Sequence, residues 1–152
     1  MSTATNRQIA ERFWAAFARR DWKGVARLLA PDAHYTDVGV DPVGAHGPAE
    51  IIARLSALDG PVRYAHRHVH TVAEGDIVIT EHVELFCFAS GEEFEHPFVS
   101  VLEMHGGLVR RYHDYSHAPN LFNQSPPEWL EQARNWRSRI VPLDQRWPGE
   151  GF

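Results

Sequence analysis

The sequence lacks several features that other classes of protein require. Its one cysteine, Cys87, excludes a disulfide within the chain, and we expect a reducing, cytoplasmic setting. No apolar run approaches the ~20 residues of a membrane-spanning helix, and the N-terminal MSTATNRQIAERF has no apolar signal-peptide core. These absences predict a cytoplasmic protein with no membrane partner.

Positive charge is also scarce. The 15 Lys and Arg residues are outnumbered by 20 Asp and Glu residues, and the net charge is −5 with histidine neutral. Because the basic residues are scattered and form no stripe, we expect no nucleic-acid partner. The length of 152 residues suits one domain with a substantial core, and we find no repeat or linker in the sequence.

The pattern of apolar residues predicts helices first and strands afterwards. Helical periodicity marks three N-terminal segments, whereas alternation marks later ones. A loop is expected at 41–47, and glycine-containing turns join the last four strands into an antiparallel meander. This order favours a single α+β domain over residues 1–152. The helices are expected at 6–20, 22–29 and 48–58, and the strands at 33–39, 62–72, 76–88, 92–104 and 108–117.

Ionisable residues interrupt two of the apolar strands. His82 and Glu84 lie in IVITEHVELFCF, where alternation places them on one face with Phe86 and Phe88. Asp114 lies in LVRRYHDYSH. A charged group among apolar neighbours is costly to bury unless it is paired or used. We therefore expect chemistry at these positions.

Four motifs in this order resemble a known superfamily. They are RDWKGVARLLAPDAHYTDV, GDIVITEHVELF, PFVSVLEMHGGLV and RRYHDYSH. Together they resemble the NTF2-like (SnoaL-like) superfamily, and within it most closely the limonene-1,2-epoxide hydrolase family, over residues 6–117. The resemblance implies a cone in which N-terminal helices pack on a curved antiparallel sheet around an internal pocket. It also implies a homodimer through the outer sheet face and no cofactor.

The resemblance assigns catalytic roles to five positions. Tyr35 and Asp37 match the Tyr and Asn that hold a water molecule in the epoxide hydrolases. His82 and Glu84 match an Arg and an Asp of that family, and Asp114 matches its last Asp. The implied relay has Asp114 as general base, His82 as a charged bridge and Glu84 as general acid. Two adjacent carboxylates would favour the charged form of His82.

The implied substrate is a small, hydrophobic, oxygenated molecule, and the leading reaction is the addition of water to an epoxide. A second resemblance, of DVGVDPVGAHG to ketosteroid isomerases, makes Asp41 a proton shuttle beside a carbonyl. Polyketide cyclases of the same superfamily use an Asp near the Asp114 position. A ligand-binding domain without turnover is the non-enzyme alternative. The substrate is expected to contact Phe86, Phe88, Phe98, His96, Trp14 and Tyr112.

The HRHVH segment places His66, His68 and His70 on one face of a strand. Imidazole is a common zinc ligand, but neighbouring positions on one strand face are about 7 Å apart. Three of them cannot easily converge on one ion, so we expect no metal site. A face at a dimer interface or at the mouth of the cone is favoured instead.

The C-terminal segment 118–152 lies outside the strong resemblance. A further helix is expected at 126–140, with Trp129 and Trp136 on one face. Such apolar residues are unlike a solvated tail. We expect an extension that closes the cone as a lid, because a cone open at one end needs a cover to exclude water; the alternative is an extended dimer interface.

Overall fold

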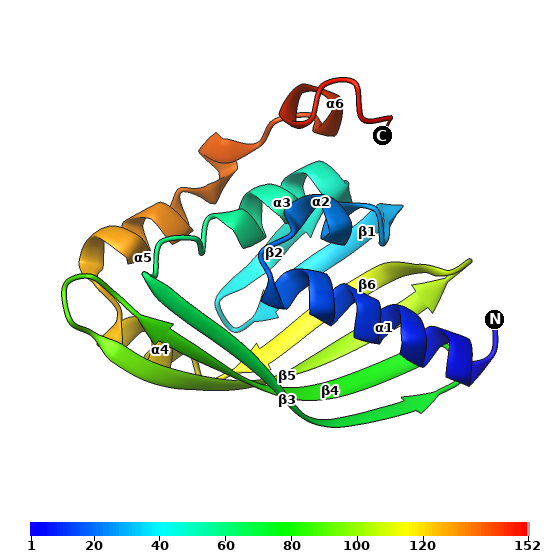
Figure 1. Ribbon diagram of the computed structural model, residues 1–152, viewed down its shortest axis with the longest axis horizontal. Helices are drawn as coiled ribbons and strands as arrows, with labels where there is room; N and C mark the ends of the chain where they lie inside the picture. Colours follow the sequence, from blue (N-terminus) through cyan, green and yellow to red (C-terminus); the bar gives the residue numbers. More distant parts are fainter. Residues whose placement is uncertain (152) are drawn as a thin grey trace.

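The computed structural model describes residues 1–151, in which helices pack on one face of a curved, six-stranded open sheet (Figure 1). The strand order is β2-β1-β6-β5-β4-β3. The predicted α+β fold is thereby confirmed. The helices on the sheet are α1 (Thr3–Ala18), α2 (Trp22–Ala26) and α3 (Gly47–Ser56), and the strands are β1 (Leu29–Val38), β2 (Asp41–His46), β3 (Arg63–Glu74), β4 (Ile77–Cys87), β5 (Glu93–His105) and β6 (Leu108–Ser116).

The strand pairing is mostly antiparallel, as predicted. Strands β3 to β6 form the expected meander, whereas β1 pairs parallel with β6. The loop expected at 41–47 is wrong, because residues Asp41–His46 form the edge strand β2, antiparallel to β1. Pro42 and Gly44 argue against a central strand, but proline is tolerated at an edge, where its missing N–H breaks no ladder.

The N-terminal helices are defined by side-chain caps. The Ser2 hydroxyl accepts from the backbone N–H of Thr5, so α1 begins earlier than the apolar periodicity alone indicates. The Asp21 carboxylate accepts from the N–H of Gly24 at the start of α2. Within residues 1–151, no helix is long and apolar enough to cross a membrane.

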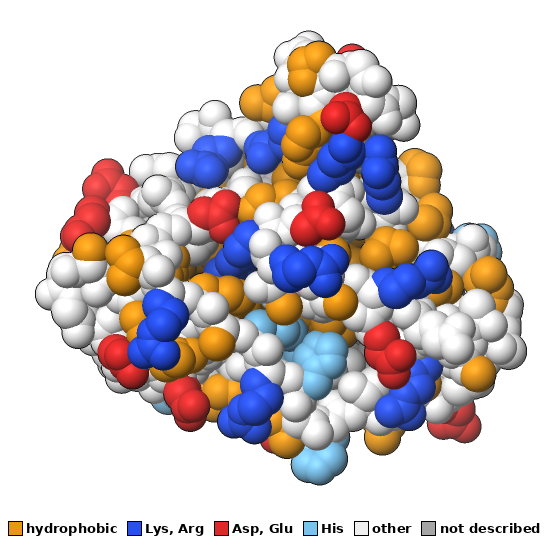
Figure 2. Space-filling view, viewed as in Figure 1, with side chains coloured by type: hydrophobic (Ala, Val, Ile, Leu, Met, Phe, Trp, Pro, Cys, Tyr) orange, Lys and Arg blue, Asp and Glu red, His pale blue; other side chains and the backbone are white. Residues whose placement is uncertain are grey.

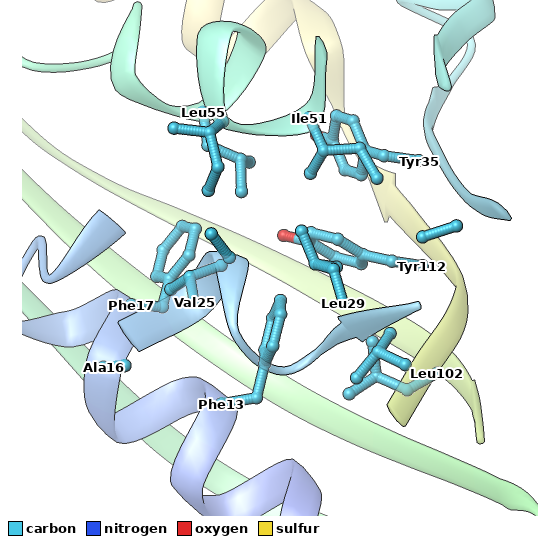
Figure 3. Packing of buried hydrophobic residues seen from close by; sticks show 14 of the residues in the cluster. Phe13, Ala16, Phe17, Val25, Leu29, Tyr35, Ile51, Leu55, Leu102 and Tyr112 are labelled. Carbon is cyan, nitrogen blue, oxygen red and sulfur yellow. The ribbon is translucent and has the colours of Figure 1, made fainter. Parts of the chain in front are cut away.

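The main core lies between the helices and the concave face of the sheet (Figure 3). Phe13 and Phe17 of α1 point towards the sheet, and Leu55 of α3 approaches from above. The rings of Tyr35 and Tyr112 lie side by side on β1 and β6, with centroids 4.5 Å apart. Burial of these large apolar side chains is the main force that holds the helices on the sheet.

The C-terminal segment is folded onto the rest of the chain. It runs from the end of β6 past α3, as Figure 1 shows. The single helix expected at 126–140 is interrupted at Asn135, and two short helices flank it that the sequence did not predict. Trp129 and Trp136 are both buried, as their shared face indicates. The elements are α4 (Ala118–Gln124), α5 (Pro127–Arg134), the 3-10 helix η1 (Trp136–Arg139) and α6 (Leu143–Arg146).

Specific hydrogen bonds hold this extension against the region that follows α3. The Trp129 indole donates to the carbonyl of Leu58 at 3.2 Å, and its ring packs on Phe86 and Phe88. The Gln132 amide donates to the carbonyl oxygen of Asp59 at 2.6 Å. The extension is therefore part of the folded domain and not a loose tail.

The outer face of the sheet carries exposed apolar side chains. Val72, Ile79, Val99 and Tyr115 are all exposed, and the register of β3 to β6 places them on the face away from the helices. Contiguous apolar surface of this kind is typical of interaction sites. The homodimer through this face stays a prediction.

Gly44 on β2 holds a backbone conformation and a close contact that only glycine allows. Its φ is +70°, and an added Cβ would lie 2.1 Å from the carbonyl oxygen of Tyr35. We expect Gly44→Ala to lower the free energy of unfolding by about 3 kcal/mol. Gly75→Ala, at φ +56° with open space around the added Cβ in the described chain, should cost only about 1 kcal/mol. Equal urea midpoints for the two variants would contradict the steric argument.

Candidate active site

A pocket opens between α3 and the concave face of the sheet. It holds about 460 Å³ of empty space, counting the solvent at its mouth. Eight of the eleven residues predicted for the site line it, whereas His82, Trp14 and Phe88 do not. The predicted residues at the pocket are Tyr35, Asp37, Glu84, Phe86, His96, Phe98, Tyr112 and Asp114.

Strand register explains why residues from four strands meet there. The parallel pairing of β1 with β6 sets Asp37 opposite Asp114, and the antiparallel pairing of β5 with β6 sets Ser100 opposite Asp114. On β4, Glu84 pairs with His96 of β5. Side chains alternate along a strand, so all of these residues point to the concave face.

Asp114 is a buried carboxyl group of the pocket that accepts hydrogen bonds from two hydroxyl groups. The Tyr35 hydroxyl donates to Asp114 Oδ2 at 3.2 Å, and the Ser100 hydroxyl donates to Asp114 Oδ1. Burial and the neighbouring charge of Asp37 raise the pKa of Asp114 well above its usual value, against the hydrogen bond from Ser100. The pocket therefore disfavours the charged form of Asp114.

Asp37 is paired with a cation from helix α3. Arg54 Nη2 lies 3.6 Å from Asp37 Oδ2, and both side chains are buried. Burial raises the pKa of Asp37 to about 6, although Arg54 acts in the opposite direction. Among residues 1–151, neither Asp37 Oδ1 nor Arg54 Nη1 has a hydrogen-bond partner. This buried acceptor and this buried donor thus have hydrogen-bonding capacity that the described chain does not use.

Glu84 is the third buried carboxyl group. The Tyr64 hydroxyl donates to Glu84 Oε1 at 2.7 Å. Burial raises the pKa of Glu84 to about 7, while the hydrogen bond from Tyr64 lowers it. Near neutral pH this group can therefore both hold and release a proton.

The structure does not form the predicted relay through His82. The ring of His82 is fully buried, and neither of its nitrogens has a hydrogen-bond partner in the described chain. It stacks on Phe98 at 4.6 Å and lies 4.2 Å from the Trp14 ring, centroid to centroid. Burial, then the nearby His66 and His68, lower the pKa of His82 to about 2.

The prediction of a charged His82 that bridges Asp114 and Glu84 is therefore wrong. His82 lies on β4 and Asp114 on β6, with β5 between them. Adjacent strands are about 4.8 Å apart, so two strands with a third between them are nearly 10 Å apart. Alternation showed that both side chains face inwards, but not that they are too far apart to bond.

Three other predicted residues lie around the pocket and not in it. Trp14 belongs to the core beneath α1, and Phe88 packs against Trp129 of the extension. Asp41 accepts from the Trp136 indole at 3.2 Å. Burial acts to raise the pKa of Asp41, but hydrogen bonds from the Gly44 N–H and Trp136 lower it. The isomerase-like role for Asp41 thus finds no support in its position.

Arg54 is the site residue that sequence reasoning missed. Its signal is the arginine in the apolar run EIIARLSAL, three residues after Ile51 and next to Leu55, both of which are buried. On a helix, this spacing places Arg54 on the edge of the face that packs on the sheet. The resembling family has an arginine at the position of His82, on the strand. This chain has no cation there, and Arg54 of helix α3 supplies one instead.

The predicted histidine face is only partly present. A register shift between His68 and His70 turns His70 to the outer face of the sheet, where its Nδ1 lies 2.8 Å from Glu81 Oε2. His66 and His68 stay on the inner face beside His82. The expectation that His70 shares their face is wrong, because a bulge reverses the alternation.

Comparison with known proteins agrees with this architecture. The family model described as the SnoaL-like domain matches residues 10–112. A structure of an M. tuberculosis LEH-like epoxide hydrolase is similar, with 20% identity, a TM-score of 0.68, and coverage of 90% of this chain and 98% of that one. No curated protein sequence matches the chain.

Two further solved structures are similar over most of their length. An NTF2-like protein from Burkholderia xenovorans LB400 has 25% identity and a TM-score of 0.70, over 83% of this chain and 99% of that one. A protein with a ketosteroid isomerase-like fold from Catenulispora acidiphila DSM 44928, in complex with trimethylamine, has 21% identity and a TM-score of 0.69, over 80% and 95%. At these identities the likeness establishes the fold.

The raised pKa of Glu84 makes stability depend on pH. A carboxyl group whose pKa is raised by folding stabilises the folded state below its unfolded pKa, and that contribution is lost as the pH rises through about 7. When the pH rises from 5 to 8, the free energy of unfolding of Glu84→Gln should therefore fall by less than that of the wild type. The difference between the two falls should be up to about 3 kcal/mol. Urea unfolding at each pH measures this difference. The exposed Glu95→Gln serves as control and should follow the wild type; an identical pH slope for Glu84→Gln would contradict the assignment.

Proposed function

The chain belongs to the SnoaL-like domain family, and we propose that it is an enzyme that adds water to an epoxide of a small hydrophobic molecule. The observation that carries this proposal is the set of three buried carboxyl groups, Asp37, Glu84 and Asp114, in one largely apolar pocket with the guanidinium of Arg54. Carboxyl groups that share a buried site cannot all ionise, so some act as acids while another acts as a base.

The order of the three pKa values divides the roles. Asp37, with a pKa of about 6, ionises first and is held by Arg54. Glu84, at about 7, is partly protonated at neutral pH, and the pKa of Asp114 is raised well above its usual value. Because the three groups interact, they titrate as a coupled set. We therefore assign the role of general base to Asp37, whereas the resemblance implies Asp114 in this role.

In the proposed reaction, a water molecule donates a hydrogen bond to the free Asp37 Oδ1 and accepts one from Arg54 Nη1. Asp37 takes a proton from this water as its oxygen forms a bond to one epoxide carbon. The bond from that carbon to the ring oxygen breaks, and Glu84 donates a proton to that oxygen. The product is a vicinal diol, and the proton on Asp37 returns to Glu84 through solvent. Phe86, Phe98 and Trp129 form the apolar wall for the rest of the substrate.

A second reaction class is supported by the environment of Asp114. A protonated carboxyl group and a tyrosine hydroxyl in an apolar pocket form the donor pair that stabilises an enolate oxygen in ketosteroid isomerases. Asp114, whose pKa is raised, and Tyr35 would form such a pair once the Tyr35 hydroxyl turns from Asp114 Oδ2 to the substrate, and Asp37 would be the base that removes a proton beside a carbonyl. This proposal differs from the isomerase-like prediction, in which Asp41 was the base.

Hydrolysis is tested with a panel of terpene and aryl epoxides in ¹⁸O-enriched water. We expect one solvent oxygen in the diol and a bell-shaped pH profile of kcat/KM, because Asp37 must be ionised and Glu84 protonated. Asp37→Asn and Glu84→Gln should each lower kcat by at least about 100-fold. The matched control is Asp32→Asn, an exposed carboxylate on the same strand as Asp37, which should keep full activity. Diol without label, or an active Asp37→Asn variant, would refute the mechanism.

Carbon-acid chemistry is tested by solvent deuterium exchange beside a ketone, followed by NMR. If the second proposal holds, exchange is lost in Asp37→Asn, falls at least about 10-fold in Tyr35→Phe, and is unchanged in Asp41→Asn. Loss of exchange in Asp41→Asn with normal folding would restore the isomerase-like role of Asp41. If neither diol nor exchange is found while ligands bind to Asp37→Asn and wild type alike, the chain is a binding domain and both enzymatic proposals fail.

A further inference from the structure

Three histidine side chains converge beside the pocket, beneath α1. His66 and His68 come from β3, and His82 comes from β4, where it is the register partner of His68. One ligand nitrogen from each lies within 4.8 Å of the other two. Histidine side chains also gather in the middle of the molecular face that carries α1 and β3, as Figure 2 shows. His66 and His68, the two members of the trio on β3, do not line the pocket.

The nitrogens of this trio are short of partners. Both ring nitrogens of the fully buried His82, and Nε2 of His66, lack a hydrogen-bond partner among residues 1–151. A buried polar atom without a partner costs free energy, and such atoms in folded proteins usually mark a function or a bound species. An ion that accepts one lone pair from each ring would remove part of that cost, while the other nitrogen of His82 carries its proton.

The surroundings keep the three rings neutral. Burial lowers the pKa of His82 to about 2 and that of His66 to about 3. Burial also lowers the pKa of His68. A neutral imidazole has the free lone pair that a metal ion needs, so no proton has to be displaced near neutral pH. Arg20 places positive charge near His66, whereas Glu11 of α1 places negative charge near His68, the exposed member of the trio.

We propose that His66, His68 and His82 bind a divalent first-row transition metal ion such as Zn²⁺. Imidazole suits these ions, and three histidines with one open position form a known type of zinc site. Zn–N bonds of about 2.0–2.1 Å in tetrahedral geometry set the nitrogens ~3.4 Å apart. Side-chain rotation has to draw the trio inwards, and the exposed His68 is free to move. Water would occupy the fourth position, on the side of His68.

This site is separate from the carboxyl pocket. Phe17 and Phe98 line the pocket, and the same two rings lie 5.5 Å and 6.2 Å from the ring of His66. The ion would therefore lie behind the pocket wall. The argument against convergence along one strand holds for His66, His68 and His70, but it does not apply to a trio that uses a neighbouring strand.

The test is a titration of the full chain, without a histidine tag, with Co²⁺ and Zn²⁺. We expect one ion per chain by calorimetry, a visible spectrum of tetrahedral Co²⁺, and displacement of Co²⁺ by Zn²⁺. His68→Asn should weaken binding by at least about 100-fold, since loss of an outer-shell partner alone costs 10–100-fold. Because His68 is exposed, this variant should fold, which circular dichroism checks.

Two matched variants separate this site from other histidines. His70→Asn lies on the same strand but on the outer face, and His34→Asn disrupts the stacked pair with His46, whose centroids are 4.4 Å apart. Both should bind metal like the wild type. Absence of one-to-one binding would overturn the proposal. So would an equal loss in His70→Asn or His34→Asn, or an unchanged affinity in His68→Asn.

Discussion

The removal of three carboxyl groups from water is the constraint on which the pocket depends. A buried carboxylate is costly unless donors or cations surround it, and each of these groups has its own. Tyr35 and Ser100 donate to Asp114, and Tyr64 donates to Glu84. The remaining cost appears as raised pKa values, which poise Asp37 and Glu84 for proton transfer near neutral pH.

The position of each group follows from strand register and one helix. The parallel pairing of β1 with β6 sets Asp37 opposite Asp114, and α3 packs over these strands with Arg54 on its buried side. A one-residue slip of either strand would turn its carboxyl group to the outer face. The cation thus comes from a helix that packs on β1, so the packing of α3 and the charge state of Asp37 are linked.

Much of this site can be predicted from the alternation along the strands, because a period of two assigns each side chain to a face. That reasoning places Glu84 on the face of Phe86, whereas Asp37 was assigned to the site by the family resemblance. It fails for His82, because the predicted meander already places a strand between His82 and Asp114, and the relay did not take the distance across that strand into account. It also fails where a bulge reverses the faces, as at His70. Arg54 was readable in principle, as a charge on an apolar helix face.

Two consecutive inward-facing positions of strand β4 lie in different environments. Glu84 belongs to the carboxyl pocket, whereas His82, two residues earlier, belongs to an aromatic layer with Trp14 and Phe98. Positions two apart are nearly 7 Å from each other along a strand. In the resembling hydrolases an arginine at the His82 position joins two carboxylates. An uncharged ring here cannot do so, and the cation of the pocket is instead Arg54 of α3, which pairs with Asp37. A histidine thereby becomes compatible with full burial, next to two other neutral histidines.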